Sequence, residues 1–537
     1  MRNRLGRFAL SCAGIVFAGH MSEGIVEAGK PFRSGPEAVR WRDGRVRLEI
    51  SRTVHTGTET GVPDSESVAA VHRAIADAMM AWGETGLAAV EVEVGYTWET
   101  AVSSGVNLVT FTDPAPFDDG VCDRNLFVSC TILRFDELTG EILGASVAFN
   151  PYKRHSASGM AGTHDLGLVM LHEMGHVLGL DHSAVLDSVM TPEVELDPSA
   201  SPRASFPLRR LASDDRLTLA ALYPSEPMAV IRGRVLRGGE PVAGAHVLAI
   251  DRRGHPAMGV ITPAGGDYEL GLPAGEYKLA VEPLDGPVGQ GQFYTIGSAA
   301  ASFPTLFWSV DGGRAASEEW IAAEVEAPRT GIDFFVAGSA VANVSTVGLI
   351  ENGAYWGASR TQLAQGANYT LGVTRNPEDG AASIALLGEG WKLEGTATSP
   401  ASAPQLLRQK LAPGVEPGSY VLAYQRPEGV SLLAGGVTVV PQPVIESAVV
   451  AEGYIRLRGK ALASQTAVAA WRENDGGDAA PGPRQLGGTS VRAGEVWLPL
   501  HAVSAEEITA VAPPDGISEV TVVTGTGVEA SVTVTRR

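Results

Sequence analysis

The pattern of apolar and polar positions predicts helices only in the N-terminal part of the chain. Between residues 65 and 82, apolar side chains recur every three or four positions, which is the period of a helix with one buried face. Asp64 or Ser65 can cap the start of this helix, and Gly83 can end it. Alternating apolar and polar residues predict strands at 46–50, 90–94 and 106–111. The opening region is therefore expected to be mixed α/β.

Two further helices are predicted before a linker that starts at a proline. The first runs from 166 to 178 and has Asp165 as a candidate cap. The second starts near Ser213, which can cap it, and stops at Tyr223, because a residue that precedes a proline disfavours helical geometry. The segment 224–227, with a proline at each end, is the predicted linker.

Beyond the linker the chain shows short alternating runs, many glycines and prolines, and almost no helical periodicity, which is typical of β-sandwich modules. About three such modules are predicted, at 228–338, 339–440 and 444–537. The first resembles carboxypeptidase-regulatory-like, prealbumin-type sandwiches through the segments 231–235, 241–245, 266–270 and 272–277. The third loosely resembles an immunoglobulin-like module of the IPT type from Ile508 onward. The fold class expected for the whole chain is therefore multidomain.

Length and charge narrow the class of protein. A chain of 537 residues exceeds what one hydrophobic core organises, so about three or four domains are expected. Hydrophobic residues make up 44% and charged residues 19%, which is the balance of a folded soluble protein. The formal net charge of −20 disfavours nucleic acid or an anionic membrane as a partner, because phosphate binding needs a concentrated basic surface.

The first twenty residues follow the order of a secretory signal peptide. Three arginines among the first seven residues precede an apolar run from Phe8 to Gly19, which is too short to span a bilayer. Cleavage after Ala18 would remove this segment, and the alternative is a buried segment of the mature fold. No later stretch reaches the roughly 18 continuous apolar residues of a membrane helix. We therefore expect a secreted protein with a signal peptide at 1–20 and no membrane span.

A histidine-rich motif carries the candidate chemistry: from His172 to His182 the chain reads His-Glu-Met-Gly-His-Val-Leu-Gly-Leu-Asp-His. Residues four apart share one face of a helix, so His172 and His176 can bind one Zn²⁺. Gly179 can adopt a left-handed conformation that ends the helix and brings His182 round as a third ligand. Glu173 can reach a water on the metal, take its proton and pass it to a leaving amine. Three protein ligands leave one position open, as in a catalytic zinc site.

This motif resembles the zinc-binding segment of the metzincin peptidases, and within them the matrixins, whose third histidine is followed by serine as His182 is by Ser183. Met190 is similar to the methionine of the family's Met-turn, which lies beneath the metal and does not bind it. The resemblance covers residues 40–225. It implies a zinc metallopeptidase catalytic domain of the α/β (α+β) class, with a mixed twisted sheet and three main helices.

Two further expectations come from the resemblance. The segment 211–224 is similar to the family's closing helix, in which acids such as Asp214 and Asp215 support the site from behind. A solvated helix start is the alternative for this pair. The segment 144–150 is placed like the edge strand that binds an extended substrate peptide, and the alternative is a strand paired on both sides.

Cysteines and acids give weaker signals. If Cys12 leaves with the signal, Cys122 and Cys130 remain, and an oxidising compartment permits a disulfide between them, two free buried thiols being the alternative. Calcium sites are common in the resembled family. The acids Asp113, Asp118, Asp119 and Asp123 are candidate Ca²⁺ ligands, with a solvated loop as the alternative. The family's second zinc motif and its cysteine-switch propeptide are not found.

The resemblance implies a secreted zinc endopeptidase that cleaves a protein or peptide substrate, with one catalytic Zn²⁺ and Glu173 as general base. One alternative is an exported binding or adhesion protein with a degenerate, non-catalytic metzincin domain, and another is a metal-dependent hydrolase of a different bond. The β-modules are candidates for binding protein or carbohydrate surfaces. Because the linker marks a domain boundary, a fragment ending near Pro224 is expected to keep activity on small peptides.

Overall fold

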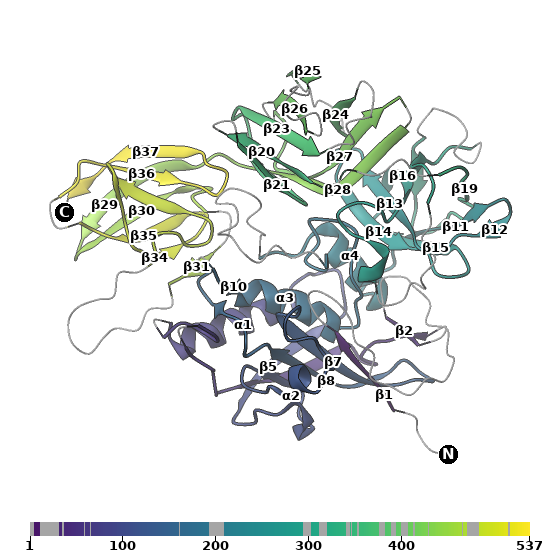
Figure 1. Cartoon of the computed structure of the whole chain (residues 1–537), viewed down its shortest axis with the longest axis horizontal. Helices are drawn as coiled ribbons and strands as arrows, with labels where there is room; N and C mark the ends of the chain where they lie inside the picture. Colours follow the sequence, from purple (N-terminus) through teal and green to yellow (C-terminus); the bar gives the residue numbers. More distant parts are fainter. Residues whose placement is uncertain are drawn as a thin grey trace.

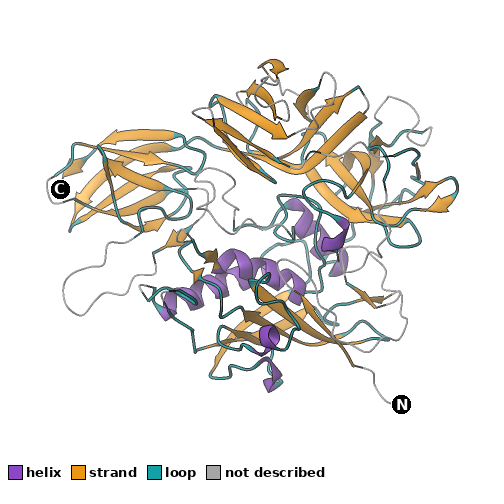
Figure 2. Ribbon diagram, in the orientation of Figure 1, coloured by secondary structure: helices purple, strands orange, loops and turns teal. Residues whose placement is uncertain are grey.

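The computed structural model describes most of the chain. The described residues are 5–10, 32–34, 37–57, 59–64, 66–159, 162–192, 209–293, 302–310, 319–339, 344, 346–351, 354–374, 382–387, 394–398, 406–411, 414–427, 429–463, 466–469, 483–513 and 516–536. Ser65 and most of the predicted signal peptide, with its cleavage site after Ala18, lie outside them. The α-helices lie in the N-terminal part, and β-rich parts follow (Figures 1 and 2).

A mixed six-stranded sheet forms the base of the N-terminal part, in the order β1-β7-β8-β6-β4-β5. Its strands are β1 Leu5–Leu10, β4 Arg45–Ser51, β5 Glu91–Thr97, β6 Leu108–Thr110, β7 Ser129–Asp136 and β8 Ile142–Phe149. The strands β5, β4, β6 and β8 run parallel to one another, and β7 runs antiparallel to β8. Short pairs are β2 Arg33–Ser34 with β3 Glu37–Ala38, and β9 His155–Ser156 with β10 His164–Asp165.

The expected edge strand at 144–150 is not an edge. It lies in β8, which pairs with β6 on one side and β7 on the other. Seven of the eight residues of β8 are buried, which is the pattern of a strand covered on both faces. β7 lies outside β8, and its other side pairs antiparallel with β1, the part of the predicted signal that the structure describes.

Helices α1 Val68–Gly83 and α3 Leu166–Val177 pack against each other beside this sheet (Figure 2). The apolar face of α1 is buried, and Trp82 donates from Nε1 to the carbonyl of Leu171 at 2.8 Å. The cap of α1 is Ser67, whose side chain accepts from the amide of Ala70, so the predicted caps Asp64 and Ser65 are two to three residues too early. The periodicity located the helix, but several polar residues precede it and any of them can cap.

Helix α3 starts as predicted, because the Asp165 side chain accepts from the amide of Leu168 at 2.9 Å. Helix α4 Ser213–Leu222 begins differently: Ser213 is its first residue, and Asp215 accepts from the amide of Ala212 at 2.7 Å. The remaining helical turns among the described residues are α2 Ala115–Asp118, η1 Val102–Ser104 and η2 Gln290–Gln292. None of the described helices is long and apolar enough to cross a membrane.

After α4 the described secondary structure is almost entirely β, in three groups that each contain two sheets of four to six strands. The first group comprises β11 Ala229–Arg237, β12 Glu240–Pro241, β13 Ala245–Asp251, β14 Pro256–Ile261, β15 Asp267–Leu272, β16 Gly275–Pro283, β17 Leu306–Phe307, β18 Ile321–Ala323 and β19 Phe334–Phe335. The second comprises β20 Val347–Glu351, β21 Ala354–Ala358, β22 Thr361–Ala364, β23 Tyr369–Thr374, β24 Ser383–Leu386, β25 Glu394–Thr398, β26 Leu406–Leu411, β27 Gly418–Arg426 and β28 Gly429–Val440.

The third group comprises β29 Val444–Ala451, β30 Tyr454–Lys460, β31 Ala467–Val468, β32 Ser490–Ala493, β33 Val496–Trp497, β34 Leu500–Val503, β35 Glu507–Val511, β36 Glu519–Val523, β37 Glu529–Thr533 and β38 Thr535–Arg536. We call the three groups the first, second and third β-parts. Among the described residues, the core cluster of the third β-part contains only residues of that part, whereas clusters in the first two also contain Val185, Leu186 and Leu217 of the N-terminal part. The number of independently folding domains therefore stays a prediction.

Candidate metal centre

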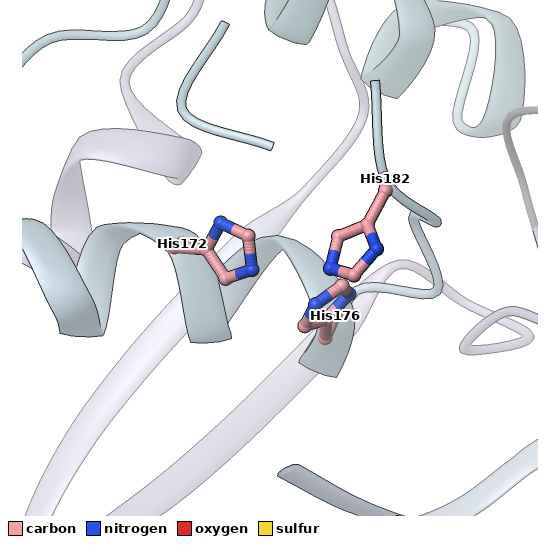
Figure 3. A group of neighbouring side chains, drawn as sticks. All are labelled: His172, His176 and His182. Carbon is pink, nitrogen blue, oxygen red and sulfur yellow. The ribbon is translucent and has the colours of Figure 1, made fainter. Parts of the chain in front are cut away.

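Three histidines converge on one point beside α3. His172 and His176 project from the helix, and His182 reaches them from the segment that follows it (Figure 3). One ligand atom from each residue can be chosen so that all three lie within 4.8 Å of one another. The three residues are at most 2% exposed. This is the only group of three or more potential metal ligands of the types His, Cys, Asp and Glu among the described residues.

Main-chain carbonyls determine which ring nitrogen faces the metal position. The Nδ1 atom of His172 lies 2.6 Å from the carbonyl oxygen of Val189, and that of His176 lies 2.8 Å from the carbonyl of Leu180. His182 makes the same contact with the carbonyl of Gln292. Because a carbonyl can only accept, each Nδ1 carries the proton and each Nε2 keeps a lone pair for a metal.

The surroundings keep these imidazoles neutral, as metal ligands must be. Burial lowers the pKa of His172 to about 4. Burial, and then the neighbouring His172, lowers the pKa of His182 to about 3, and the same causes together with His182 lower that of His176 well below its usual value. The Nε2 atom of His172 is buried without a hydrogen-bond partner, which is costly unless a ligand binds it. The three rings therefore fit Zn²⁺, which prefers imidazole nitrogen and few ligands.

The turn between the second and third histidines requires glycine. Gly179 has a φ of +94°, and a Cβ at this position would lie 2.1 Å from the carbonyl oxygen of Val39. Any other residue would be strained in its backbone and would also collide with this oxygen. The structure thus gives Gly179 the left-handed turn expected from the sequence.

Met190 lies directly under α3. A Cβ built on Gly175 would lie 2.2 Å from the sulfur of Met190, so the helix needs a glycine there for the methionine to approach. Met190 is 2% exposed, and its carbonyl accepts from the amide of Ser183 at 2.9 Å. Sequence reasoning missed the role of Gly175, although a glycine inside an otherwise apolar helix is a signal of close packing.

Asp214 and Asp215 are both 1% exposed, so the alternative of a solvated helix start describes neither of them. Asp215 holds the turn before Met190: it accepts from the hydroxyl of Ser188 and from the amide of Val189 at 3.0 Å. Asp214 accepts from the hydroxyl of Ser183 at 2.6 Å and from the amide of Gly259 in the first β-part at 2.9 Å. The two acids support the segment that follows the third histidine.

Glu173 lies on α3 next to His172, and its carboxylate is held by two hydroxyls of β7. Oε1 accepts from Ser129 at 2.5 Å, and Oε2 accepts from Thr131. All three side chains are fully buried. Sequence reasoning missed Ser129 and Thr131. Their alternate positions on a strand put them on one face, but the sequence gives no sign that this face meets α3.

Cys122 and Cys130 form a disulfide in the structure, within a small apolar cluster beside β7. The candidate calcium ligands do not converge. Asp113 accepts from the amides of Val102 and Ala115, and the other described contacts of these acids are with separate neighbours. They therefore act mainly as local caps and surface partners in this loop.

Comparison with known proteins assigns this site to a class. Residues 60–224 match the family model described as Matrixin, so this part of the chain is a metallopeptidase-like domain. More narrowly, it is a matrixin-like domain, because the chain is similar to matrix metalloproteinase-C of Caenorhabditis elegans. The two sequences are 28% identical over 203 aligned residues, which make up 37% of this chain and 31% of that protein. The chain thus spans about a third of the length of this curated relative.

Solved structures show only distant similarity. SGBP-B of the Bacteroides ovatus mixed-linkage glucan utilization locus, in complex with mixed-linkage heptasaccharide, is 16% identical with a TM-score of 0.16, covering 55% of this chain and 61% of that one. Extracellular domains 3–5 of Drosophila OTK are 9% identical with a TM-score of 0.16, covering 58% of this chain and 98% of that one. Neither superposition is close enough to bear on function.

Proposed function

We propose that the chain is a zinc-dependent endopeptidase in which Glu173 is the general base. The observation that carries this proposal is the convergence of three Nδ1-protonated histidines beside a buried glutamate on the same helix. Zinc, when bound by His172, His176 and His182, would polarise the substrate carbonyl and acidify a water molecule. The carboxylate of Glu173 would accept the proton of the attacking water and deliver it to the leaving amine.

The hydroxyls of Ser129 and Thr131 would orient this base. Each donates to one oxygen of Glu173, and hydrogen bonds to a charged acceptor are stronger than those between neutral groups. A carboxylate held by two hydrogen bonds has little orientational freedom left to lose when the substrate reacts. Glu173 would therefore keep one orientation during the reaction. The matrixin match over residues 60–224 supports the same assignment.

We propose that an extended peptide substrate pairs with β7, because this strand carries the hydroxyls that hold Glu173 and lies outside β8 in the sheet. In the full chain the outer side of β7 pairs with Leu5–Leu10. Export with cleavage of residues 1–20 would remove that strand and free the edge. Secretion and this processing step are part of the proposal.

Cleavage of casein or gelatin by the purified exported chain, with and without a chelator, tests the proposal. We expect cleavage that stops with chelator and returns with added Zn²⁺. Zinc-loaded protein that cleaves no protein or peptide would contradict it and would favour the exported binding protein considered above. Turnover of small esters without peptide cleavage would instead indicate a hydrolase of another bond.

A further inference from the structure

We propose that the first two β-parts complete the zinc site, and that the main-chain carbonyl of Gln292 is a positioning group for the third ligand, His182. The inference rests on the proposed zinc site but not on peptidase activity. It concerns how the ligand is held, which a measurement of metal binding reports directly.

The three histidines differ in where their Nδ1 partners come from. Val189 and Leu180, which serve His172 and His176, lie within 17 and 4 residues of the histidine they contact. Gln292, which serves His182, lies 110 residues away in the first β-part. Outer-shell partners of this kind fix the tautomer and the ring orientation of a ligand. The orientation of His182 therefore depends on a part of the chain outside the matrixin-like domain.

The carbonyl of Gln292 sits in a short, well-anchored turn. The side-chain oxygen of Gln292 accepts from the main-chain amide of Gly289 at 2.7 Å. The main-chain amide of Gln292 donates to the carbonyl of Gly289 at 3.1 Å. Val288 and Phe293, on either side of the turn, are each 4% exposed in a hydrophobic cluster shared with the second β-part. A turn closed by its own side chain and anchored at both ends presents its carbonyl in one direction.

The segment between His182 and Met190 is held by both β-parts. The amide of Leu186 donates to the carbonyl of Ala434 in β28 at 2.7 Å, and Arg360 donates to the carbonyl of Leu186 at 2.6 Å. Val185 is fully buried in an apolar cluster with residues from β13, β16, β27 and β28.

A third contact runs through Gly259 of β14, whose amide donates to Asp214. A Cβ on Gly259 would lie 3.1 Å from Val185 and 2.3 Å from the ring of His246. The close fit at this position means that the first β-part packs tightly against the ligand-bearing segment.

Zinc affinity of the full exported chain tests the proposal. Gln292→Ala removes the oxygen that closes the turn, so the carbonyl loses its fixed direction. Because changes in outer-shell partners typically weaken metal binding by about tenfold to a hundredfold, we expect a tenfold or larger rise in the zinc dissociation constant, measured by competition with a chromophoric chelator. The visible spectrum of the Co²⁺-substituted protein should also change.

Two matched variants separate positioning from general damage. Gln292→Glu keeps an acceptor oxygen for Gly289 and should restore zinc binding to near the wild-type value. Gln442→Ala removes an exposed glutamine whose side-chain amide donates to the carbonyl of Gln365, and it should leave zinc binding unchanged. Wild-type zinc affinity and an unchanged Co²⁺ spectrum in Gln292→Ala would overturn the proposal.

If Gln292→Ala does not fold, Gly259→Ala tests whether the contact between the first β-part and the ligand-bearing segment affects zinc binding. It should accelerate zinc loss to chelator, whereas Gly271→Ala in the same β-part should not, because its added Cβ would meet neighbours only at 3.6 Å. Equal zinc loss from both would overturn the inference. A wild-type chain that binds no zinc would refute the proposed function itself, while one that binds zinc without cleaving peptides would refute only the peptidase activity.

Discussion

At the scale of single residues, the local spacing of the motif could be interpreted from the sequence because helix geometry relates its members. His172, Glu173 and His176 share one helix, and Gly179 turns the chain by itself. The partners that orient them could not be predicted. Ser129 lies 44 residues from Glu173, and Gln292 lies 110 residues from His182, so only the tertiary fold brings them together.

Replacement of Glu173 should abolish catalysis without releasing the metal. Glu173→Gln and Glu173→Ala both lack the proton acceptor, so we expect peptide cleavage to fall by roughly 10²–10⁴-fold or more at an unchanged zinc content. Alanine also removes the carboxylate that accepts from the hydroxyls of Ser129 and Thr131, which costs on the order of 1–3 kcal/mol. The melting temperature should therefore fall in the alanine variant and stay near wild type in the glutamine variant. Cleavage by Glu173→Gln within about threefold of wild type would mean that another group is the base.

Asp215 should make stability depend on pH. Burial, followed by the charge of Asp214, raises the pKa of Asp215 from 3.8 to about 7. A carboxyl with a raised folded-state pKa stabilises the fold below its unfolded pKa, and this stabilisation is lost as pH rises through the folded value. Between pH 4 and 7 the folded state holds about one extra proton, so stability should fall by about 1.4 kcal/mol per pH unit from this group.

Asp215→Asn imitates the protonated acid and should lack this part of the slope. Denaturant titration of metal-free protein between pH 4 and 8 measures the difference in unfolding free energy between wild type and variant. Asp64→Asn, at an exposed position, controls for the loss of a charge alone. Wild-type and Asp215→Asn curves that stay parallel across this range would show that Asp215 is ionised throughout.

At the scale of elements, the sequence located helices better than their ends, and strands better than their neighbours. Periodicity reports which face of an element is buried, so the 65–82 pattern gave α1 within three residues. It does not report pairing, and β8 was wrongly expected at the edge. Its nearly continuous burial is the property of an interior strand, and the run of small and apolar residues from Gly144 to Phe149 was the available signal.

The cap of α1 offers a test at this scale. Ser67→Ala removes the acceptor for the amide of Ala70 and should destabilise the N-terminal part by about 1 kcal/mol. Asp64→Ala, at the position favoured by the sequence pattern, should stay within about 0.5 kcal/mol of wild type, because it lies outside the helix and is exposed. Thermal unfolding followed by circular dichroism distinguishes the two. A larger loss of stability in Asp64→Ala than in Ser67→Ala would indicate that Asp64 caps the helix, as the sequence pattern predicts.

At the scale of the whole molecule, the predicted linker at 224–227 suggests that the N-terminal part functions alone, whereas its contacts with the first two β-parts favour dependence on them. Leu217 belongs to the core of the first β-part, and Leu186 to that of the second. We now expect a fragment ending at Pro224 to lose zinc on dialysis under conditions in which the full chain keeps it. Such a fragment would expose apolar surface and leave the Nδ1 of His182 without its carbonyl.

A chain that ends at Gln442 is the matched control. It lacks only the third β-part, whose core cluster contains no described residue of the N-terminal part, so it should retain zinc like the full chain. Zinc analysis after dialysis compares the three proteins. Full zinc retention by the fragment ending at Pro224 would show that the N-terminal part binds zinc without the β-parts, as the predicted linker suggests.

The distance between His182 and Gln292 along the chain also determines when the site can form during synthesis. A polypeptide is synthesised from its N-terminus, so His182 is made 110 residues before the carbonyl that contacts it, and Ala434 is made later still. The metal centre of a nascent chain therefore closes only when most of the protein has been made. A chain assembled in this order has no finished metal centre until residues well beyond the matrixin-like domain have been synthesised.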